Sequence, residues 1–245
     1  PGEIGICLVA TVTPDFLSPA AACLLQKELG FPEDTICFDL NAACSGFVYA
    51  LHTAECLLAS TPRKYGLVLG AEILSRVMDF GDRSTCVLFG DGAGAALVEW
   101  GANYPSLHAV LGCGATQRCS TSPASTLPRP PMSIWTASRC SASPWRLCPA
   151  VPGRCWTGPA LPRRTSTSSC STSQPAHHRL CREEAGHRPA RCPGNIERTG
   201  NTSAASIPLV ISELHDLGKV GPGSRVLVVG FGGGLTWGGA LVEFA

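Results

Sequence analysis

The chain has 245 residues, enough for one large domain or two smaller ones, and its formal net charge is +1. Such a charge gives no overall field that would attract nucleic acid or a membrane. No apolar run has the length of a membrane span, and the first residues lack the charged start of a signal peptide, so we expect a cytoplasmic protein.

Fourteen cysteines would suit a secreted disulfide scaffold. We reject that interpretation, because six of them lie in apolar runs where cysteine packs as a small hydrophobic residue: Cys7, Cys23, Cys37, Cys44, Cys56 and Cys86.

The charged residues are distributed unevenly. Residues 104–194 hold 11 arginines, no lysine and two acids, a net charge of +9, whereas the rest of the chain holds 8 basic and 16 acidic residues. The same segment contains 13 of the 20 prolines and 8 of the 14 cysteines. Proline at this density interrupts both helical and strand periodicity. We therefore predict no regular structure across residues 112–194.

Apolar periodicity elsewhere predicts strands that alternate with helices. The predicted elements, in chain order, are a strand over residues 4–12, a helix over 18–30, a strand over 35–40, a helix over 44–60, strands over 65–71, 85–89 and 93–99, a helix over 203–217, and strands over 225–230 and 239–244. In the first helix, Ser18 is placed to cap the start, Pro19 suits the first turn and Gly30 follows the end. This alternation predicts an α/β layered fold.

Cys44, in the segment LNAACSGFVYAL, is the first candidate for chemistry. It follows a predicted strand and opens a predicted helix, where the helix dipole and the free N–H groups favour a thiolate. Small neighbouring residues leave room for a substrate to reach the sulfur. The alternative is a buried structural cysteine, since free cysteine is often part of a core.

Three further segments carry candidate residues. Asn201, in GNTSAAS, offers an amide donor just before a helix of small residues, or is simply an asparagine near a helix cap. Gly232 and Gly233, in GFGGGLTWGGAL, form a turn whose N–H groups can stabilise an oxyanion. The alternatives for this turn are a tight hairpin and, more weakly, a phosphate site, although no P-loop lysine follows. Asp91, in FGDGAGAALVE, is interpreted as a turn residue before a strand.

Together and in this order, the four segments resemble the β-ketoacyl-acyl-carrier-protein synthase III family over residues 4–111 and 195–245. The resemblance implies a thiolase-like layered αβαβα fold, incomplete in this chain, and a homodimer. An asparagine at position 201 argues against the elongating synthases, which carry a second catalytic histidine there. Plant-type polyketide synthases share a cysteine, a histidine and an asparagine but end in a different glycine turn.

The resemblance also assigns roles to individual residues. It implies that Cys44 is the nucleophile, that Asn201 is the catalytic asparagine, and that Gly232 or Gly233 donates to an oxyanion. Arg83, shortly before FGDGAG, matches an arginine that contacts coenzyme A in the family. The implied reaction starts fatty-acid synthesis by decarboxylative condensation of an acyl-CoA with malonyl-acyl-carrier protein, through an acyl-cysteine. Acyl-CoA and acyl-carrier protein are then the partners, and neither a cofactor nor a metal is expected, because no residues have metal-ligand spacing.

Two features depart from the family. The resemblance implies a further strand-and-helix region with coenzyme-A contacts ahead of Pro1. The family's catalytic histidine lies in a His-Gln-Ala or His-Gln-Pro segment upstream of the asparagine, and no such segment occurs in this sequence. His177 and His178 follow Gln-Pro-Ala, in a different context. We therefore expect condensation by this chain to be impaired.

We interpret residues 112–194 as a frame-shifted translation. Codons allowed for TSTSSCSTS (residues 165–173), read two bases later, permit Ile-Asp-Phe-Phe-Val-Leu-His-Gln, the family's strand and its catalytic histidine. Residues 133–146 and 183–189 also permit family-like sequences when shifted. The competing interpretation is a basic disordered arm that binds acidic carrier protein or nucleic acid.

The chain is accordingly divided into three parts. Residues 1–111 hold the end of the first thiolase-like half with the nucleophile and the start of the second half. Residues 112–194 are aberrant and disordered, and residues 195–245 end the second half. Two alternatives to a synthase III remain: a non-catalytic fragment or frame-shifted product, and another thiolase-fold condensing enzyme that takes a malonyl-coenzyme A extender.

Overall fold

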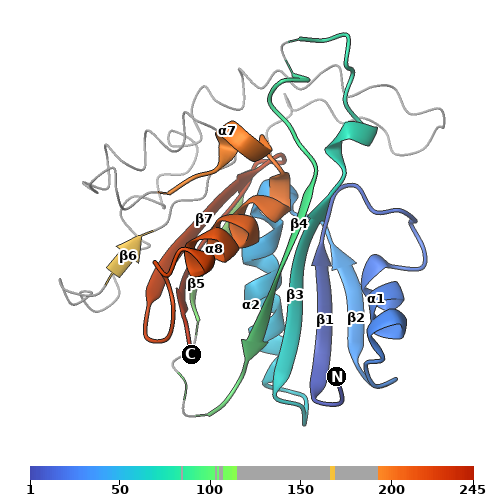
Figure 1. The fold of residues 1–245 in the computed structure, drawn as a ribbon. Helices are drawn as coiled ribbons and strands as arrows, with labels where there is room; N and C mark the ends of the chain where they lie inside the picture. The colour runs from blue at the N-terminus through green and yellow to red at the C-terminus, as the bar shows by residue number, and fades with distance from the viewer. Residues whose placement is uncertain (84, 103, 105–106, 115–165, 169–192) are drawn as a thin grey trace.

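The computed structural model describes residues 1–83, 85–102, 104, 107–114, 166–168 and 193–245 (Figure 1). Its strands are β1 (Ile4–Ala10), β2 (Ile36–Leu40), β3 (Tyr65–Glu72), β4 (Gly92–Glu99), β5 (His108–Cys113), β6 (Ser166–Ser168), β7 (Arg225–Gly232) and β8 (Thr236–Glu243). Its α-helices are α1 (Ala21–Leu29), α2 (Gly46–Leu58), α7 (Ile196–Thr199) and α8 (Ser206–Asp216), and its short 3₁₀ helices include η1 (Ala43–Ser45), η2 (Leu74–Arg76) and η4 (Ser203–Ala205). Every predicted helix and strand is confirmed within a few residues, except the strand predicted over residues 85–89.

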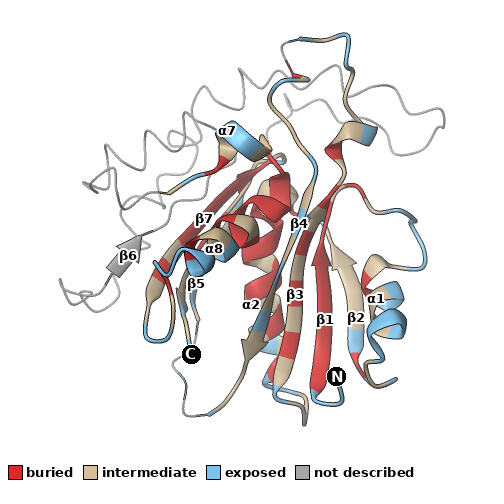
Figure 2. Cartoon of the chain, in the orientation of Figure 1, coloured by how far each residue is buried: buried red, intermediate tan, exposed pale blue. Residues whose placement is uncertain are grey.

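The first sheet has the strand order β2-β1-β3-β4. β1 pairs in parallel with β2 and β3, and β4 closes the edge antiparallel to β3. All seven residues of β1 are buried (Figure 2). Cys7 and Val9 pack on the α1 side, whereas Ile6 and Leu8 belong to the core around α2. A continuous apolar run suits a parallel strand that is covered on both faces.

The second sheet has the order β5-β8-β7-β6. β8 pairs antiparallel with both β5 and β7. β6 pairs in parallel with β7, with Ser166 opposite Arg225. The prediction of no regular structure over residues 112–194 is therefore wrong at β6 and at the end of β5. An unpaired sheet edge offers backbone N–H and C=O groups to any strand, whatever its side chains, so side-chain composition did not reveal this pairing.

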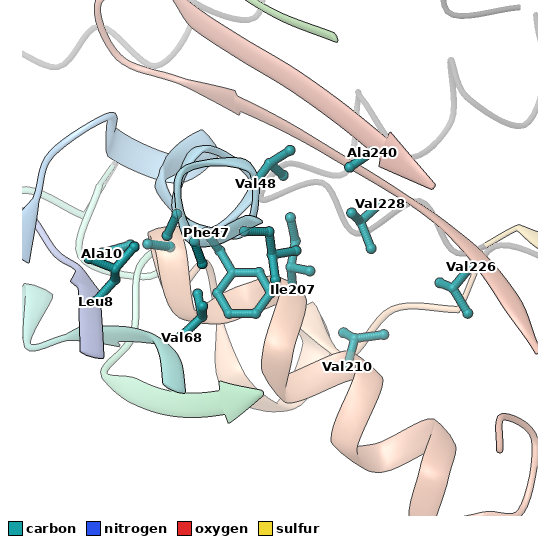
Figure 3. Close-up of a cluster of buried hydrophobic side chains, with 14 of the residues drawn as sticks. Leu8, Ala10, Phe47, Val48, Val68, Ile207, Val210, Val226, Val228 and Ala240 are labelled. Atoms are coloured by element: carbon teal, nitrogen blue, oxygen red, sulfur yellow. The ribbon is translucent and has the colours of Figure 1, made fainter. Parts of the chain in front are cut away.

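The helices α2 and α8 lie between the two sheets, and α1 covers the outer face of the first sheet (Figures 1 and 3). Apolar side chains from both helices and both sheets meet in one cluster (Figure 3). The cluster includes Phe47 and Val48 from α2, Ile207 and Val210 from α8, Leu8 and Val68 from the first sheet, and Val226, Val228 and Ala240 from the second sheet. This shared helical layer fixes how the ends of α2 and α8 lie relative to each other.

The start of α1 is capped by a residue from another strand. The prediction that Ser18 caps this helix is wrong, because the helix begins at Ala21 and no side chain of its own segment caps it. Instead, the Asp39 carboxylate at the end of β2 accepts hydrogen bonds from the Ala21 N–H (2.8 Å) and the Ala22 N–H (2.9 Å). A negative charge there also stabilises the helix dipole. Gly30 ends the helix as predicted, with a φ of 65°.

Replacing Asp39 by alanine is expected to lower the free energy of unfolding by about 1–2 kcal/mol, because two helix N–H groups lose their acceptor. Urea unfolding followed by circular dichroism measures the change. Glu33→Ala, at an exposed position before β2, serves as the control. An equal loss of stability in the two variants would show that Asp39 does not cap the helix.

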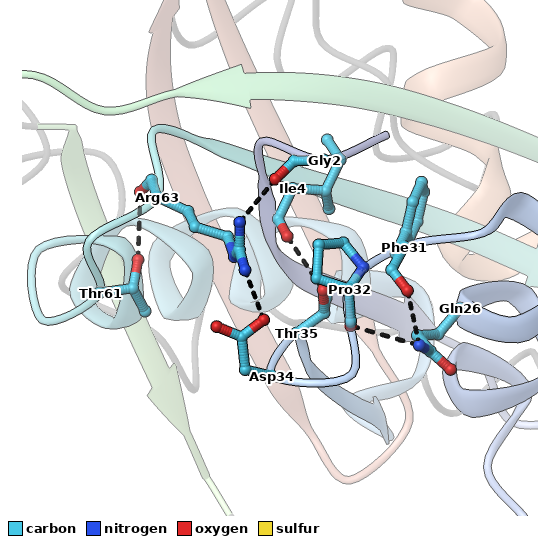
Figure 4. Close-up of polar contacts among 9 residues, drawn as sticks. All are labelled: Gly2, Ile4, Gln26, Phe31, Pro32, Asp34, Thr35, Thr61 and Arg63. Atoms are coloured by element: carbon cyan, nitrogen blue, oxygen red, sulfur yellow. Dashed lines mark hydrogen bonds and ion pairs between the residues drawn. The ribbon is translucent and has the colours of Figure 1, made fainter.

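Polar contacts tie together the ends of β1, β2 and β3 that lie near the N-terminus (Figure 4). Arg63 donates to the Gly2 carbonyl (2.5 Å) and pairs with Asp34 (2.5 Å). Thr35 Oγ1 donates to the Ile4 carbonyl (2.9 Å). These contacts close the end of the sheet at which β1, β2 and β3 begin. The opposite edge, at the carboxyl ends of the parallel strands, is where open α/β sheets place their binding sites.

Two further expectations are corrected. Residues 85–88 form turns, and Phe89 makes only an isolated parallel bridge with Asn201. Cys7 is buried as expected, but Cys23 and Cys56 are exposed, so an apolar run did not suffice to bury them. All seven cysteines in the described part of the chain are free of disulfides. No helix among the described residues is long and apolar enough to cross a membrane.

Candidate active site

Cys44 lies at the carboxyl end of the first sheet, where the chain turns from β2 into α2. The Ala43 N–H donates to Asn41 Oδ1 (3.2 Å), and Ala43 has a φ of 47°, which is uncommon for a residue with a β-carbon. This sharp turn places Cys44 in η1, directly ahead of the 13-residue helix α2, and leaves it partly exposed. Partial exposure at a helix N-terminus is the environment of a reactive thiol.

The buried thiol of Cys7 has a different environment. Burial, with contributions from Cys37, Asp39 and Cys23, raises the pKa of Cys7 to about 12. Burial also raises the pKa of Cys37. Both thiols are therefore held in the neutral form at neutral pH, and a neutral thiol is not a nucleophile. The location of Cys44 suits nucleophilic chemistry better than either of these positions.

Asn201 occupies a turn of the same construction as the Cys44 turn. The Ser203 N–H donates to Asn201 Oδ1 (2.8 Å), and Ser203 has a φ of 51°. The 3₁₀ helix η4 follows and leads into α8, as η1 leads into α2. In each turn an asparagine side chain bonds the N–H two residues later, and that later residue is left-handed. The two turns place Cys44 and Ala204 at equivalent positions.

The backbone before β4 holds Asn201 in place. The Asn201 N–H donates to the Leu88 carbonyl (2.8 Å), and the Gly90 N–H donates to the Asn201 carbonyl (3.1 Å). Asn201 is only 2% exposed. Because its Oδ1 accepts from a backbone N–H, the Nδ2 end of the amide is the part that can donate to a ligand. Residues 88–90, which include the end of the strand predicted over residues 85–89, thus support a candidate site residue.

Asp91 lies directly before β4, as predicted, although it is not assigned to a turn. It accepts hydrogen bonds from the Ser75 N–H (2.8 Å) and the Ser75 hydroxyl (2.6 Å), and so links η2 to the start of β4. Desolvation by itself would raise the pKa of Asp91. The Ser75 donors, together with the Leu74 N–H and the Arg76 charge, outweigh that effect and lower the pKa.

The glycine segment lies directly against the Cys44 turn. A β-carbon on Gly232 would lie 2.7 Å from the Ala42 carbonyl oxygen and 2.9 Å from the Ala43 β-carbon. A β-carbon on Gly230 would lie 3.0 Å from the Cys44 carbonyl oxygen. Real β-carbon contacts are not this short, so only glycine lets β7 approach the backbone around η1 so closely.

Side chains from β8 reinforce this contact. The Thr236 hydroxyl donates to the Ala42 carbonyl (2.8 Å), and the Ser45 hydroxyl donates to Thr236 Oγ1 (2.8 Å). β7 and β8 form the hairpin that was one alternative for this sequence, and Gly233 lies in its turn. The hairpin and the close approach to the cysteine turn are therefore features of the same segment.

Gly232→Ala is expected to displace the Cys44 turn and to lower stability by about 1–3 kcal/mol, because the added methyl group overlaps atoms on both sides. The rate at which Cys44 reacts with iodoacetamide and the thermal unfolding midpoint measure the two effects. Gly221→Ala is the matched control, because a β-carbon at Gly221 would meet no atom within 4 Å. Similar behaviour of both variants would contradict close packing at Gly232.

The structure brings η1, which carries Cys44, against β7, which ends at Gly232, and against η4, which begins two residues after Asn201. Arg83 is exposed in the loop between η2 and β4. The catalytic and binding roles of Cys44, Asn201, Gly232, Gly233 and Arg83 stay predictions. Among the residues that the structure describes, no cluster of three or more His, Cys, Asp or Glu side chains could hold a metal ion.

Sequence reasoning missed two residues next to this site. Thr236 bonds the backbone of the Cys44 turn, and Glu72 is a carboxylic acid that is 3% exposed at the end of β3. The available signal for Glu72 was an acid that ends an apolar strand, in LVLGAEIL. A buried acid of this kind usually has several hydrogen-bond donors around it.

The fold has two sheets around a shared helical layer, and the cysteine turn and the asparagine turn, which have the same construction, lie at one end of that layer. These features define an enzyme of the thiolase-like layered α/β class. Residues 38–114 match the family model of 3-oxoacyl-[acyl-carrier-protein] synthase III, and residues 171–244 match the model of its C-terminal part. The chain belongs to the 3-oxoacyl-[acyl-carrier-protein] synthase III family, which is the β-ketoacyl family that its motifs resemble.

Individual relatives agree with the family models. The chain is 34% identical over 255 residues to β-ketoacyl-[acyl-carrier-protein] synthase III of Clostridium acetobutylicum, covering 100% of the chain and 78% of the relative. It is 37% identical over 253 residues to the synthase III of Streptococcus suis, covering 98% of the chain and 78% of the relative. The crystal structure of the Aquifex aeolicus synthase III superposes with a TM-score of 0.81 at 31% identity, covering 99% of this chain and 78% of that one.

Proposed function

We propose that the active site of this family member uses Cys44 to accept an acyl group from an acyl-CoA and to condense it with malonyl-acyl-carrier protein. The Cys44 sulfur attacks the thioester carbonyl, coenzyme A leaves as its thiol, and the acyl group stays on the cysteine. The malonyl thioester then loses carbon dioxide, and the resulting carbanion attacks the acyl-cysteine to give a β-ketoacyl product and a free Cys44 thiol.

The contact of η1 with η4 and β7 carries this proposal. In the proposed reaction Asn201 Nδ2 donates to the thioester oxygen of the malonyl group as negative charge develops there. The Cys44 N–H and an N–H of Gly232 or Gly233 hold the oxyanion that forms when the acyl carbonyl is attacked. Donors already aimed at a developing charge give a large share of rate enhancement, because they need no reorganisation during the reaction.

The proposed partners follow from the names of the relatives. Acyl-carrier protein appears in the names of both curated relatives, and we propose the same carrier, with acyl-CoA, as substrates of this chain. Arg83, exposed in the loop between η2 and β4, is the proposed contact for coenzyme A. A homodimer, a cytoplasmic location and a reaction without a cofactor are further parts of the proposal.

Condensation is expected to be weak in this chain, because its sequence has no His-Gln-Ala or His-Gln-Pro segment ahead of Asn201. Acylation of Cys44 requires mainly the thiolate and the oxyanion donors, so we expect it to survive at least in part. The two family-model matches leave residues 115–170 between them, and these residues form most of the segment that we interpret as frame-shifted.

A labelling experiment tests the proposal. The purified chain is incubated with radiolabelled acetyl-coenzyme A, digested and mapped by mass spectrometry, and the acetyl label is expected on the peptide that contains Cys44. Absence of label would favour a non-catalytic product. Condensation is then assayed with malonyl-acyl-carrier protein and, separately, with malonyl-coenzyme A. A preference for malonyl-coenzyme A would favour a different condensing enzyme of the same fold.

A further inference from the structure

Glu72 bonds residues 11–13, the segment directly after β1, through one of its two carboxylate oxygens. Glu72 Oε2 accepts hydrogen bonds from the Thr13 hydroxyl (2.8 Å), the Val12 N–H (3.0 Å) and the Thr11 hydroxyl (3.3 Å). Thr13 Oγ1 in turn accepts from the Ile73 N–H (2.8 Å), so the hydroxyl that donates to the carboxylate is itself fixed. This oxygen therefore has its full set of donors, all from one side of the carboxyl group.

The other oxygen, Glu72 Oε1, is enclosed and forms no hydrogen bond of standard geometry. Glu72 lies two residues after Gly70 on β3, so its side chain leaves the strand on the face that packs against Ala204 of η4. Burial raises the pKa of Glu72 overall, and the hydrogen-bond donors of Thr13, Val12, Ser203 and Ala204 lower it in part. Glu72 is thus anchored through Oε2 to the segment after β1, and its side chain lies against the residues that follow Asn201.

The segment beside Glu72 is under backbone strain. Ser203 is left-handed, with a φ of 51°, a conformation that costs a residue with a β-carbon about 1 kcal/mol or more. Such a conformation persists only where the surroundings hold it. β3 supplies a close backing, because a β-carbon on its residue Gly70 would overlap the Ala204 carbonyl. The Ser203 N–H is also the group that orients the Asn201 amide.

We propose that Glu72 is a positioning residue for Asn201: it joins the segment after β1 to Ser203 and Ala204 and so holds the strained turn in which Asn201 Nδ2 faces the site. Glu72 touches no substrate in this proposal and acts through Ser203. The consequence for catalysis rests on the proposed function, whereas the placement of the Asn201 side chain can be measured without any activity.

Selective labelling with ¹⁵N-asparagine gives a direct readout, because the chain contains only four asparagines: Asn41, Asn103, Asn195 and Asn201. The side-chain amide signals of Asn201 are assigned by their loss in Asn201→Asp. Glu72→Gln keeps an oxygen for the donors of the segment after β1 but turns an NH₂ group toward the Ala204 N–H, so donor meets donor. We expect the Asn201 signals to move and hydrogen exchange in residues 201–206 to rise about tenfold, the effect of losing one hydrogen-bond interaction.

Glu99→Gln is the matched control, because Glu99 ends β4 beside Tyr65, at the opposite end of the β3–β4 pair, where it forms an ion pair with Lys64. It should leave the Asn201 signals in place. Ser203→Ala removes the donor on the other side of the proposed contact and should move the same signals, so it decides the matter if Glu72→Gln fails to fold.

Three results would overturn the proposal. They are unmoved Asn201 signals in folded Glu72→Gln, unmoved Asn201 signals in Ser203→Ala, and equal movement of the Asn41, Asn195 and Asn201 signals, which would indicate general loosening. Failure of Cys44 to take up an acetyl group would reject the proposed function and leave these measurements unaffected.

Discussion

Restoring the shifted reading frame over residues 112–194 is expected to raise the condensation rate by a factor of about 10²–10³ or more. Decarboxylation develops negative charge on the malonyl thioester oxygen, and removing one preorganised donor from such a site costs about 10²–10³ in rate. The shifted reading supplies the missing histidine together with the strand that leads to it. The rates of the two chains with malonyl-acyl-carrier protein, measured under identical conditions, give the ratio.

The position of β6 supports this experiment. β6 covers residues 166–168, and it pairs in parallel with β7, the strand that carries Gly230 and Gly232. The codons for Ile-Asp-Phe-Phe in the shifted reading span residues 165–169, and three of these four residues are apolar, which suits a strand inside a layered α/β fold. The histidine codon of the shifted reading spans Ser171 and Thr172, three residues or more beyond the end of β6.

A histidine-to-alanine version of the restored chain separates the histidine from the rest of the segment. It should keep the restored strand and lose most of the gain in rate. Equal condensation rates for the original and the restored chain would show that the segment does not contain the missing catalytic group. Sequencing the DNA that encodes residues 112–194 tests the frame-shift hypothesis independently of any activity.

Cys44→Ala is expected to abolish covalent acetylation and to lower acyl transfer by a factor on the order of 10⁴ or more, as removal of a nucleophile does in other covalent mechanisms. No neighbouring hydroxyl can substitute without a new base, since a serine or threonine oxygen is a weak nucleophile when it is not activated. Intact-protein mass spectrometry after incubation with acetyl-coenzyme A measures the covalent adduct.

Cys56→Ala provides a matched control on α2, the helix that follows Cys44, because Cys56 is exposed near the far end of that helix. Its acetylation should equal that of the original chain. Retention of the label in Cys44→Ala, or its loss in Cys56→Ala, would place the acyl group on a different residue and would contradict the proposed mechanism.

The candidate segments around Cys44 and Asn201 were accessible to sequence reasoning because each turn is built from contacts between near neighbours. In both turns the asparagine bonds the N–H two residues later, so the residues that shape the turn are adjacent in the chain. The strands and helices with long apolar runs, such as β1 and α2, were predicted within a few residues for the same reason. The predicted strand at residues 85–89 failed because Phe89 contacts Asn201, more than a hundred residues away, instead of a neighbouring strand.

The amino-acid sequence by itself determined the family, the α/β order of the elements and the identity of the candidate nucleophile. Only the tertiary structure decided which distant residues support the fold and the site: Asp39 caps a helix that begins 18 residues earlier, Thr236 bonds a carbonyl 194 residues away, and Glu72 bonds Thr13, beyond the end of β1. Hydrogen bonds and close glycine contacts of this kind join segments that only the folded chain brings side by side. Their partners are distant in the chain, so no local pattern of residue types records them.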